Sequence, residues 1–169
     1  GFFLKMENSG AMGTDSSGES NTFTVSGTLT QNVDTPSNNF ATFNPLDTFH
    51  TTPTFTNGNT TLSLNPASSK DTYVPTTLGM TSGKYYAEAK FISGVAYTYI
   101  GITDTPATAS KILGDFTNSA RIRGDDGVTR INNVASTTLT TWTTNDIIGI
   151  GVDLTNLKIY YSKNGVWMN

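Results

Sequence analysis

The 169-residue chain has the length of a single domain, and only 14% of its residues are charged, with a net charge of −3. Thr, Ser and Asn must therefore supply much of the polar surface, and this composition favours β-strands joined by turns. The absence of Cys and the single His exclude disulfides and thiolate or histidine-cluster zinc sites, while the weak negative charge argues against nucleic acid as a partner.

Short strands bounded by turn residues are the main predicted elements. In chain order, they are Thr22–Val25, Thr28–Gln31, Phe40–Phe43, Thr54–Thr56, Thr60–Leu64, Lys84–Phe91, Tyr97–Ile102, Arg121–Arg123 and Thr137–Thr141. Stretches 8–21 and 32–39 are predicted to be loops, and one short helical turn is expected at Thr105–Leu113. No apolar run approaches the roughly 20 residues of a membrane helix, so membrane insertion is not expected.

The clearest strand is predicted at Lys84–Phe91, where residue types alternate with a period of two. One face carries Tyr85, Ala87, Ala89 and Phe91, and the other carries Lys84, Tyr86, Glu88 and Lys90. The first face is expected to point toward the core, and the second toward water or a partner.

A hairpin is predicted in the last part of the chain. Its two strands place Ile148, Ile150, Val152 and Leu154, and then Leu157, Ile159 and Tyr161, at alternate positions. Gly149 and Gly151 leave one face of the first strand bare, so another backbone or a large aromatic side chain is expected to lie against it. Asn164-Gly165 predicts a type I′ turn, followed by a third strand from Val166.

Several of these segments resemble, in order, the strands of SPRY domains. Residues 82–90 (Ser-Gly-Lys-Tyr-Tyr-Ala-Glu-Ala-Lys) resemble the family's S-G-K-aromatic-Y-x-E strand, and Tyr99–Ile102 is similar to the short strand after it. Asp146–Leu154 and Lys158–Gly165 are similar to the late D-x-I-G strand and to the aromatic-rich strand that ends in K-N-G. The resemblance implies an all-β fold, an antiparallel β-sandwich of the concanavalin-like or SPRY jelly-roll type.

The first third resembles a lead-in common in bacteriophage tail and virion proteins that carry such modules. The similar residues run from Asp15 to Val25 and from Asp34 to Leu46. Residues 1–169 are predicted to form one sandwich domain, with 1–50 as a loop-rich lead-in and 51–169 as the SPRY-like core. A complete SPRY sandwich continues beyond the K-N-G turn, so the chain is expected to be a fragment or to be completed by another chain through strand addition.

Enzyme chemistry is not predicted. A glycoside-cleaving sandwich needs two carboxylates about 5 to 10 Å apart, whereas Glu88 shares its strand face with Tyr86 and Lys90, which are not acids. His50 is the single imidazole that could activate a Ser or Thr nucleophile, and no nucleophile-elbow glycines surround it. Glu88 is therefore interpreted as a solvated or salt-bridged surface residue, and His50 as a loop residue.

Four aromatic and two acidic residues are the candidates for ligand binding. They are Tyr97, Tyr99, Trp142, Trp167, Asp125 and Asp126. The aromatic rings either stack on sugar rings or pack in the core. The two acids lie in a glycine-flanked segment that either forms a plain β-turn or, with Asp104 or Asp115, binds calcium. Because their spacing lacks a D-x-D-x-D pattern, no metal is predicted, and no cofactor is predicted either.

The resemblance implies a phage virion module that binds or assembles. The first hypothesis is an adhesion module on a tail fibre or another external appendage, which binds a host-surface glycan or protein through loops carried on rigid sheets. The alternative is a structural or decoration protein that contacts other virion subunits, and the third hypothesis is a polysaccharide-cleaving enzyme. Because such fibres are commonly homotrimers, a homotrimer in contact with other virion subunits is the expected assembly.

Overall fold

The computed structural model describes residues 1–31, 39–48, 53–64, 72–94, 96–104 and 112–169. All of the regular structure in these residues is β-strand, and neighbouring strands are antiparallel. The strands are β1 (Thr54–Thr56), β2 (Thr61–Ser63), β3 (Lys84–Lys90), β4 (Tyr99–Thr103), β5 (Ser119–Arg123), β6 (Val128–Ile131), β7 (Val134–Thr138), β8 (Ile147–Asp153), β9 (Lys158–Lys163) and β10 (Val166–Trp167).

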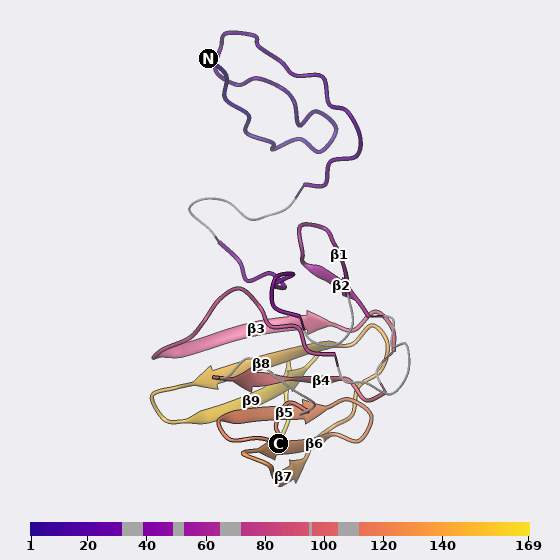
Figure 1. Ribbon diagram of the computed structural model, residues 1–169, viewed down its shortest axis with the longest axis vertical. Coiled ribbons are helices and arrows are strands. Elements are labelled where there is room, and N and C mark those ends of the chain that lie inside the picture. Colours follow the sequence, from indigo (N-terminus) through magenta and orange to yellow (C-terminus); the bar gives the residue numbers. More distant parts are fainter. Residues whose placement is uncertain (32–38, 49–52, 65–71, 95, 105–111) are drawn as a thin grey trace.

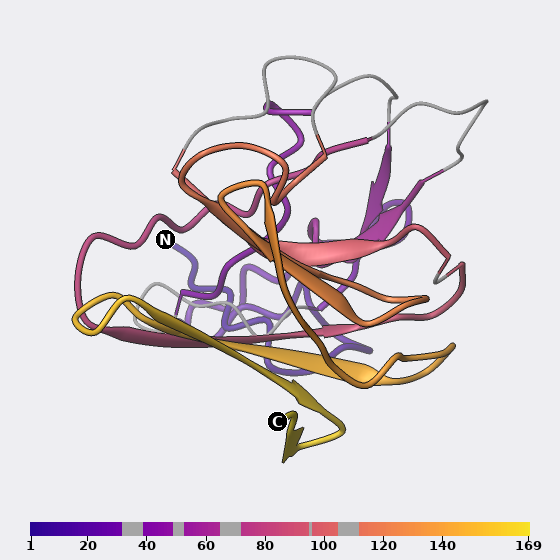
Figure 2. The same ribbon diagram turned by 90° about the horizontal axis from the view of Figure 1, so that it is seen from below.

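Two four-stranded sheets form the body of the molecule. One sheet has the order β10-β9-β8-β3 and the other has the order β4-β5-β6-β7, while β1 and β2 pair as a separate hairpin. The two larger sheets lie face to face as two layers (Figure 1, Figure 2). The predicted antiparallel β-sandwich is therefore confirmed.

The core fills the space between the two layers. Its buried hydrophobic side chains are Ile122, Trp142, Ile148, Ile150, Val152 and Tyr161. Strand β8 supplies three of them at every second position, as the period-two pattern predicts for a strand with one buried face. The core is therefore centred on β8 and on β5, which contributes Ile122.

The predicted strand at Lys84–Phe91 is present as β3, but its inner face is only partly buried. Ala89 and Phe91 are half-buried, whereas Tyr85 and Ala87 are exposed. The expectation that this whole face points into the core is wrong, because β3 is the terminal strand of its sheet and the core lies under β8.

The late hairpin and the turn after it form as predicted. Asn164 and Gly165 have φ angles of 50° and 80°, which are the two positive values that a type I′ turn requires. Just before β8, the Asp146 carboxylate accepts hydrogen bonds from the Thr143 amide and the Asn164 side chain, each at 2.8 Å, and lies 2.9 Å from Lys163 Nζ. This carboxylate therefore ties the start of β8 to the turn between β9 and β10.

The lead-in differs from the sequence prediction. Thr22–Val25 and Thr28–Gln31 are not strands: the Phe23 amide donates to the Gly13 carbonyl at 2.8 Å, Gln31 Nε2 donates to the Met6 carbonyl at 2.8 Å, and the segment has no strand partner among the described residues. The Asp15 carboxylate accepts from the amides of Phe3, Ser17 and Asn21 at 2.8, 2.9 and 2.8 Å. These bonds hold the pKa of Asp15 well below its usual value, and the bond from the Phe3 amide has the largest effect.

Other predicted boundaries also shift. The segment Phe40–Phe43 forms no strand, and its Phe43 makes an isolated bridge with Thr76. The strand predicted at Thr137–Thr141 runs from Val134 to Thr138 instead. The shift of this last strand follows from its pairing with β6, in which Ile131 lies opposite Val134 and Arg130 lies opposite Ala135.

Three sequence predictions fall wholly or largely outside the described residues. They are the helical turn at Thr105–Leu113, the loop at 32–39 and the loop residue His50. The division of the chain near residue 50 stays a prediction. In the described part of the chain, the structure contains no helix with the length and apolar character that a bilayer span requires.

Adjacent isoleucines on β8 give a matched test of the sandwich. Ile148 is 0% exposed and Ile147 is 37% exposed, so Ile148→Ala is expected to lower the free energy of unfolding by about 2–5 kcal/mol. Ile147→Ala is expected to cost less than half as much, because its side chain leaves no enclosed cavity. Urea unfolding of both variants measures the difference, and equal losses would contradict the assignment of faces.

The Asp146 contacts predict how stability changes with pH. The Thr143 amide first, and then Asn164 and Lys163, hold the pKa of Asp146 below its unfolded value of about 3.9. The stability that this carboxylate contributes is therefore present above about pH 4 and is lost as the pH falls toward the folded pKa. Asp146→Asn is expected to lower the Tm at neutral pH and to flatten its decline below about pH 4. Thermal melts followed by circular dichroism test this, and a decline as steep as in the wild type would refute it.

Candidate functional site

The outer face of the β10-β9-β8-β3 sheet carries three aromatic side chains, Tyr86, Tyr160 and Trp167, which we name the outer aromatic cluster. Even-numbered residues of β8 point into the core, so its odd-numbered residues and their cross-strand partners face outward. Gly151 pairs with Tyr86 on one side and with Tyr160 on the other. Trp167 lies one row away, where it pairs with Ser162.

Two glycines of β8 form the floor under these rings. A Cβ atom at Gly149 would collide with the Tyr86 hydroxyl and with Ser162 Oγ, and one at Gly151 would lie 3.1 Å from Trp167 Cη2. Any larger residue would therefore displace an aromatic ring. The sequence prediction that a large aromatic side chain lies against the bare glycine face is confirmed.

The rings of the cluster are arranged around Trp167. Its ring centroid lies 5.9 Å from that of Tyr86 and 6.2 Å from that of Tyr160, with interplanar angles of 69° and 73°. Such edge-to-face contacts fix the relative orientation of the rings. Tyr86, Tyr160 and Trp167 nevertheless stay 54%, 48% and 52% exposed, so the cluster presents ordered aromatic surface to solvent.

Polar groups border the cluster. The Tyr86 hydroxyl donates a 2.7 Å hydrogen bond to the Glu88 carboxylate, and Lys84 Nζ lies 3.6 Å from Asp153 Oδ2 at the end of the face. Hydrogen bonds from Asn156 first, and then the charge of Lys84, lower the pKa of Asp153. This border offers hydrogen-bond acceptors and both signs of charge around an aromatic centre.

The site has the chemistry of a binding surface. Aromatic faces pack against apolar patches, and the Glu88 carboxylate accepts hydrogen bonds from hydroxyl or amide donors. Glu88 faces Gly149 across the strand pair and accepts from Tyr86, so its nearest partners on this face are not a second acid. Within the described ranges, no three His, Cys, Asp or Glu side chains are placed to share a metal ion.

The structure brings three of the sequence-predicted site residues together at one end of the other sheet. Tyr97, Asp125 and Asp126 surround Arg123, whose guanidinium lies 4.6 Å from the Tyr97 ring centroid. Arg123 Nη2 donates to Asp125 at 2.8 Å, and Nη1 lies 3.2 Å from Asp126. The hydrogen bond from Arg123 is the main cause that lowers the pKa of Asp125. Each carboxylate is thus already paired with a cation.

The glycine-flanked segment at 124–127 is a turn between β5 and β6. Asp126 Oδ1 accepts from the Val128 amide at 2.9 Å, an Asx-type contact that stabilises such turns. The two further acids considered for calcium have partners of their own: Asp104 accepts from Asn118 at 2.8 Å, and Asp115 accepts from Arg130 at 2.8 Å. The arrangement corresponds to the plain β-turn alternative.

The other sequence-predicted aromatic residues lie apart. Tyr99 is half-buried under the guanidinium of Arg121, 4.4 Å from its ring centroid. Trp142 is 1% exposed and packs on Phe91 in the core, so its ring presents no surface to a ligand. Trp167 is part of the outer aromatic cluster, on the sheet opposite to β4, the strand that Tyr97 precedes.

Sequence reasoning did not select Tyr86 and Tyr160 as site residues. A usable signal was present, because each occupies the polar face of its strand, where a large ring has no core to enter. Strand pairing places both Tyr86 and Tyr160 opposite Gly151, which has no side chain. No single segment of the sequence encodes this pairing.

No protein-family model matches the chain, and no curated protein is similar to it in sequence. Among solved structures, the SPRY domain of human HERC1 is similar to this chain with a TM-score of 0.55, at 19% identity over 75% of this chain and 78% of that one. A second human SPRY domain is also similar, with a TM-score of 0.43 and 19% identity over 56% of this chain and 72% of that one. The first of these likenesses shows that the chain has the fold of a SPRY-type β-sandwich.

The glycine floor predicts how the cluster responds to a small change. Gly149→Ala is expected to push the Tyr86 ring away from Ser162 and to disturb its contact with Trp167, because the new methyl group occupies the space of the Tyr86 hydroxyl. The aromatic near-ultraviolet circular dichroism of the folded protein should change, while the far-ultraviolet spectrum should not. Gly79→Ala is the control outside the cluster, because an added Cβ atom there meets no atom within 4 Å, and an unchanged near-ultraviolet spectrum for Gly149→Ala would contradict the packing.

Proposed function

We propose that this chain is a non-catalytic recognition module whose outer aromatic cluster binds sugar rings of a host-surface glycan. The observation that carries the proposal is the group of three half-exposed rings held over two glycines of one strand. Aromatic faces stack on the apolar faces of pyranose rings, and Tyr and Trp combine a large apolar area with few rotatable bonds. The rings are ordered before a ligand arrives, which reduces the entropy lost on binding.

The polar border supports a glycan as the ligand. A sugar ring has an apolar face and a rim of hydroxyl groups, so its recognition needs an aromatic surface with hydrogen-bond acceptors at its edge. Glu88 lies beside the glycine floor and supplies a carboxylate, whereas Ser162, on the other side of Gly149, is 2% exposed. Charge-assisted hydrogen bonds from sugar hydroxyls to Glu88 would add to stacking.

The biological setting that we propose is the exterior of a bacteriophage particle, on a tail fibre or a related appendage. Support comes from the resemblance of residues 15–25 and 34–46 to the lead-in of phage virion proteins. In a homotrimer, three weakly binding clusters would act together, because linked sites raise the effective concentration of each other's ligand.

Contact with another virion subunit is the second candidate function. An aromatic centre with a charged border, such as the Lys84–Asp153 pair, is also typical of protein–protein interfaces. In that case the outer aromatic cluster binds a neighbouring protein chain and no glycan.

Glycan-array binding followed by titration tests the first candidate. Trp167→Ala is expected to weaken glycan binding roughly tenfold, which corresponds to about 1.4 kcal/mol. Leu157→Ala removes another exposed apolar side chain, from the β8–β9 turn, and should leave binding unchanged. Tyr97→Ala should also leave it unchanged, because Tyr97 lies in the turn before β4, a strand of the opposite sheet.

Three outcomes would reject the glycan proposal. Loss of binding in Tyr97→Ala but not in Trp167→Ala would move the site to the turn beside Arg123. Absence of glycan binding, together with Trp167-dependent binding to a virion protein, would establish the second candidate. Release of reducing sugar that Glu88→Gln abolishes would identify an enzyme.

A further inference from the structure

Two turns of the chain contain an Asn-Gly pair, Asn57-Gly58 between β1 and β2 and Asn164-Gly165 between β9 and β10. In such a pair the Gly nitrogen can attack Cγ of the Asn side chain, because Gly has no Cβ atom to obstruct the approach and has wide conformational freedom. All four residues have positive φ angles, of 53° and 61° in the first turn and of 50° and 80° in the second. The sign of φ therefore does not distinguish the two pairs, and the contacts of each Asn do.

The Asn164 side chain is held by both of its polar atoms. Its Oδ1 accepts a 2.9 Å hydrogen bond from the Ile147 amide, and its Nδ2 donates a 2.8 Å bond to the Asp146 carboxylate. The second bond is charge-assisted, because the lowered pKa of Asp146 keeps this carboxylate ionised at neutral pH. Rotation of the Asn164 side chain toward the Gly165 nitrogen must break both bonds.

Asn57 is held less firmly. Within the described residues its side chain makes one hydrogen bond, a 3.0 Å bond from Nδ2 to the exposed Thr61 hydroxyl, and both Asn57 and Gly58 are exposed. The strands on either side have three residues each and form a separate two-stranded hairpin. Hairpins of this size are marginally stable, so this turn opens more readily than the four-stranded sheet that holds Asn164.

We propose that Asn57 deamidates spontaneously in the folded protein, whereas Asn164 is protected by its turn. The Gly58 nitrogen bonds to Asn57 Cγ, the bond from Cγ to Nδ2 breaks, and Nδ2 leaves as ammonia with the proton of the Gly58 amide. Water then opens the five-membered ring. Attack at Cγ gives Asp, and attack at the main-chain carbonyl carbon gives isoaspartate. The inference does not depend on the ligand of the outer aromatic cluster.

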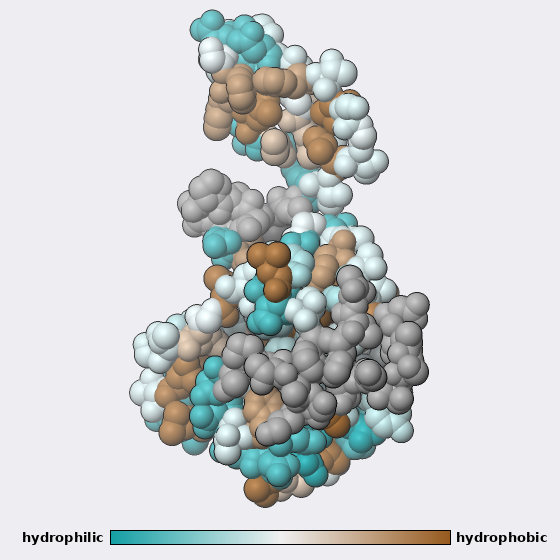
Figure 3. All heavy atoms as spheres, in the orientation of Figure 1, coloured by the Kyte–Doolittle hydropathy of each residue, from teal (hydrophilic) through white to brown (hydrophobic). Residues whose placement is uncertain are grey.

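The reactive turn lies at a contact between the hairpin and the lead-in. The Asn59 carbonyl accepts a 2.9 Å hydrogen bond from the Phe43 amide, and Phe43 also bridges Thr76. The hairpin lies on the side of the sandwich that faces the lead-in (Figure 1), whose surface gathers hydrophobic residues (Figure 3). Isoaspartate adds one methylene group to the backbone two residues before Asn59. The reaction therefore loosens the attachment of the lead-in surface to the sandwich.

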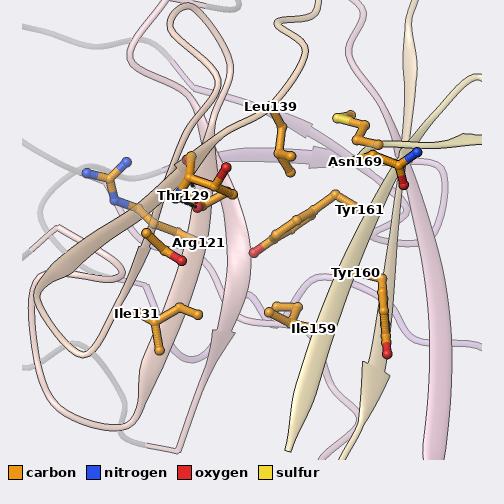
Figure 4. Close-up of a pocket in the computed structure, with 11 residues that line it drawn as sticks. Arg121, Thr129, Ile131, Leu139, Ile159, Tyr160, Tyr161 and Asn169 are labelled. Carbon is orange, nitrogen blue, oxygen red and sulfur yellow. Dashed lines mark hydrogen bonds between the residues drawn. The ribbon is translucent and has the colours of Figure 1, made fainter.

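The protected turn lies beside the outer aromatic cluster instead. It joins β9, which carries Tyr160, to β10, which carries Trp167. On β9, Tyr161 extends toward the opposite sheet and Tyr160 points away from it (Figure 4). Deamidation at Asn164 would place a second carboxylate beside that of Asp146, and the two like charges would repel each other. Protection of Asn164 thus preserves the cluster while the hairpin changes.

Peptide mapping by mass spectrometry tests the proposal on the full chain. The protein is incubated at mildly alkaline pH, folded or unfolded in urea. In urea the two sites should react at similar rates, because both are Asn-Gly pairs. In the folded chain Asn57 is expected to react at least about tenfold faster than Asn164, which must break one more side-chain hydrogen bond and a charged one. Equal folded rates, faster reaction at Asn164 or no reaction at Asn57 would each overturn the proposal.

A pair of variants tests the cause of the protection. Asp146→Ala removes the acceptor of Asn164 Nδ2, so the folded variant is expected to deamidate at Asn164 at a rate closer to that of Asn57. Thr61→Ala is the matched control, which removes the acceptor of Asn57 Nδ2 and should leave the rate at Asn164 unchanged. Circular dichroism verifies that both variants are folded during the incubation. A wild-type rate at Asn164 in folded Asp146→Ala would contradict the protective role of this bond.

Hydrogen exchange on incubated protein tests the effect on the lead-in contact. The Phe43 amide is expected to lose protection as isoaspartate accumulates, while the Ile150 amide in β8 keeps its protection. Asn57→Gly tolerates the positive φ angle and cannot form the ring, so it should retain Phe43 protection after the same incubation. Unchanged Phe43 protection in converted wild-type protein, or equal loss in Asn57→Gly, would refute the effect.

Discussion

The packing of β8 on both of its faces is the constraint on which the rest of this structure depends. Its even-numbered residues fill the core with Ile148, Ile150 and Val152, while Gly149 and Gly151 leave the other face open to aromatic rings. A shift of register by one residue would bury the glycines and expose the isoleucines. The same pairing therefore fixes both the hydrophobic core and the position of the outer aromatic cluster.

Local hydrogen bonding keeps the neighbouring strands in that register. Asp146 connects the residue before β8 to Asn164 in the turn that leads into β10, and Asp153 holds Asn156 in the turn between β8 and β9. Carboxylates at both ends of β8 thus restrain the turns that carry Tyr160 and Trp167. The positions of the exposed rings on this face therefore depend on these turns as well as on the packing of the rings themselves.

Alternation predicts the parts of the fold in which one strand face meets the core. β3, β8, β9 and the Asn164-Gly165 turn follow directly from the residue order, and so does the need for a large group over Gly149 and Gly151. Alternation fails for 22–31, because a pattern suited to a strand specifies no partner edge, and bonds within the lead-in, such as that from the Phe23 amide to the Gly13 carbonyl, prevail. It also gives no guidance for Trp142, which lies outside the strands, or for the grouping of Tyr86 with Trp167, which non-local pairing creates.

The long sequence separation within the outer aromatic cluster has a kinetic consequence. Tyr86 and Ser162 are 76 positions apart, yet they meet over the same glycine. Contacts of this kind form only after a large loop has closed, which makes sandwiches of non-local strands slow to fold. Tyr85 and Tyr86 lie on β3, which is the terminal strand of its sheet among the described residues, and Lys84, Glu88 and Lys90 place charges along the same strand. Charged residues on a terminal strand oppose edge-to-edge association of chains.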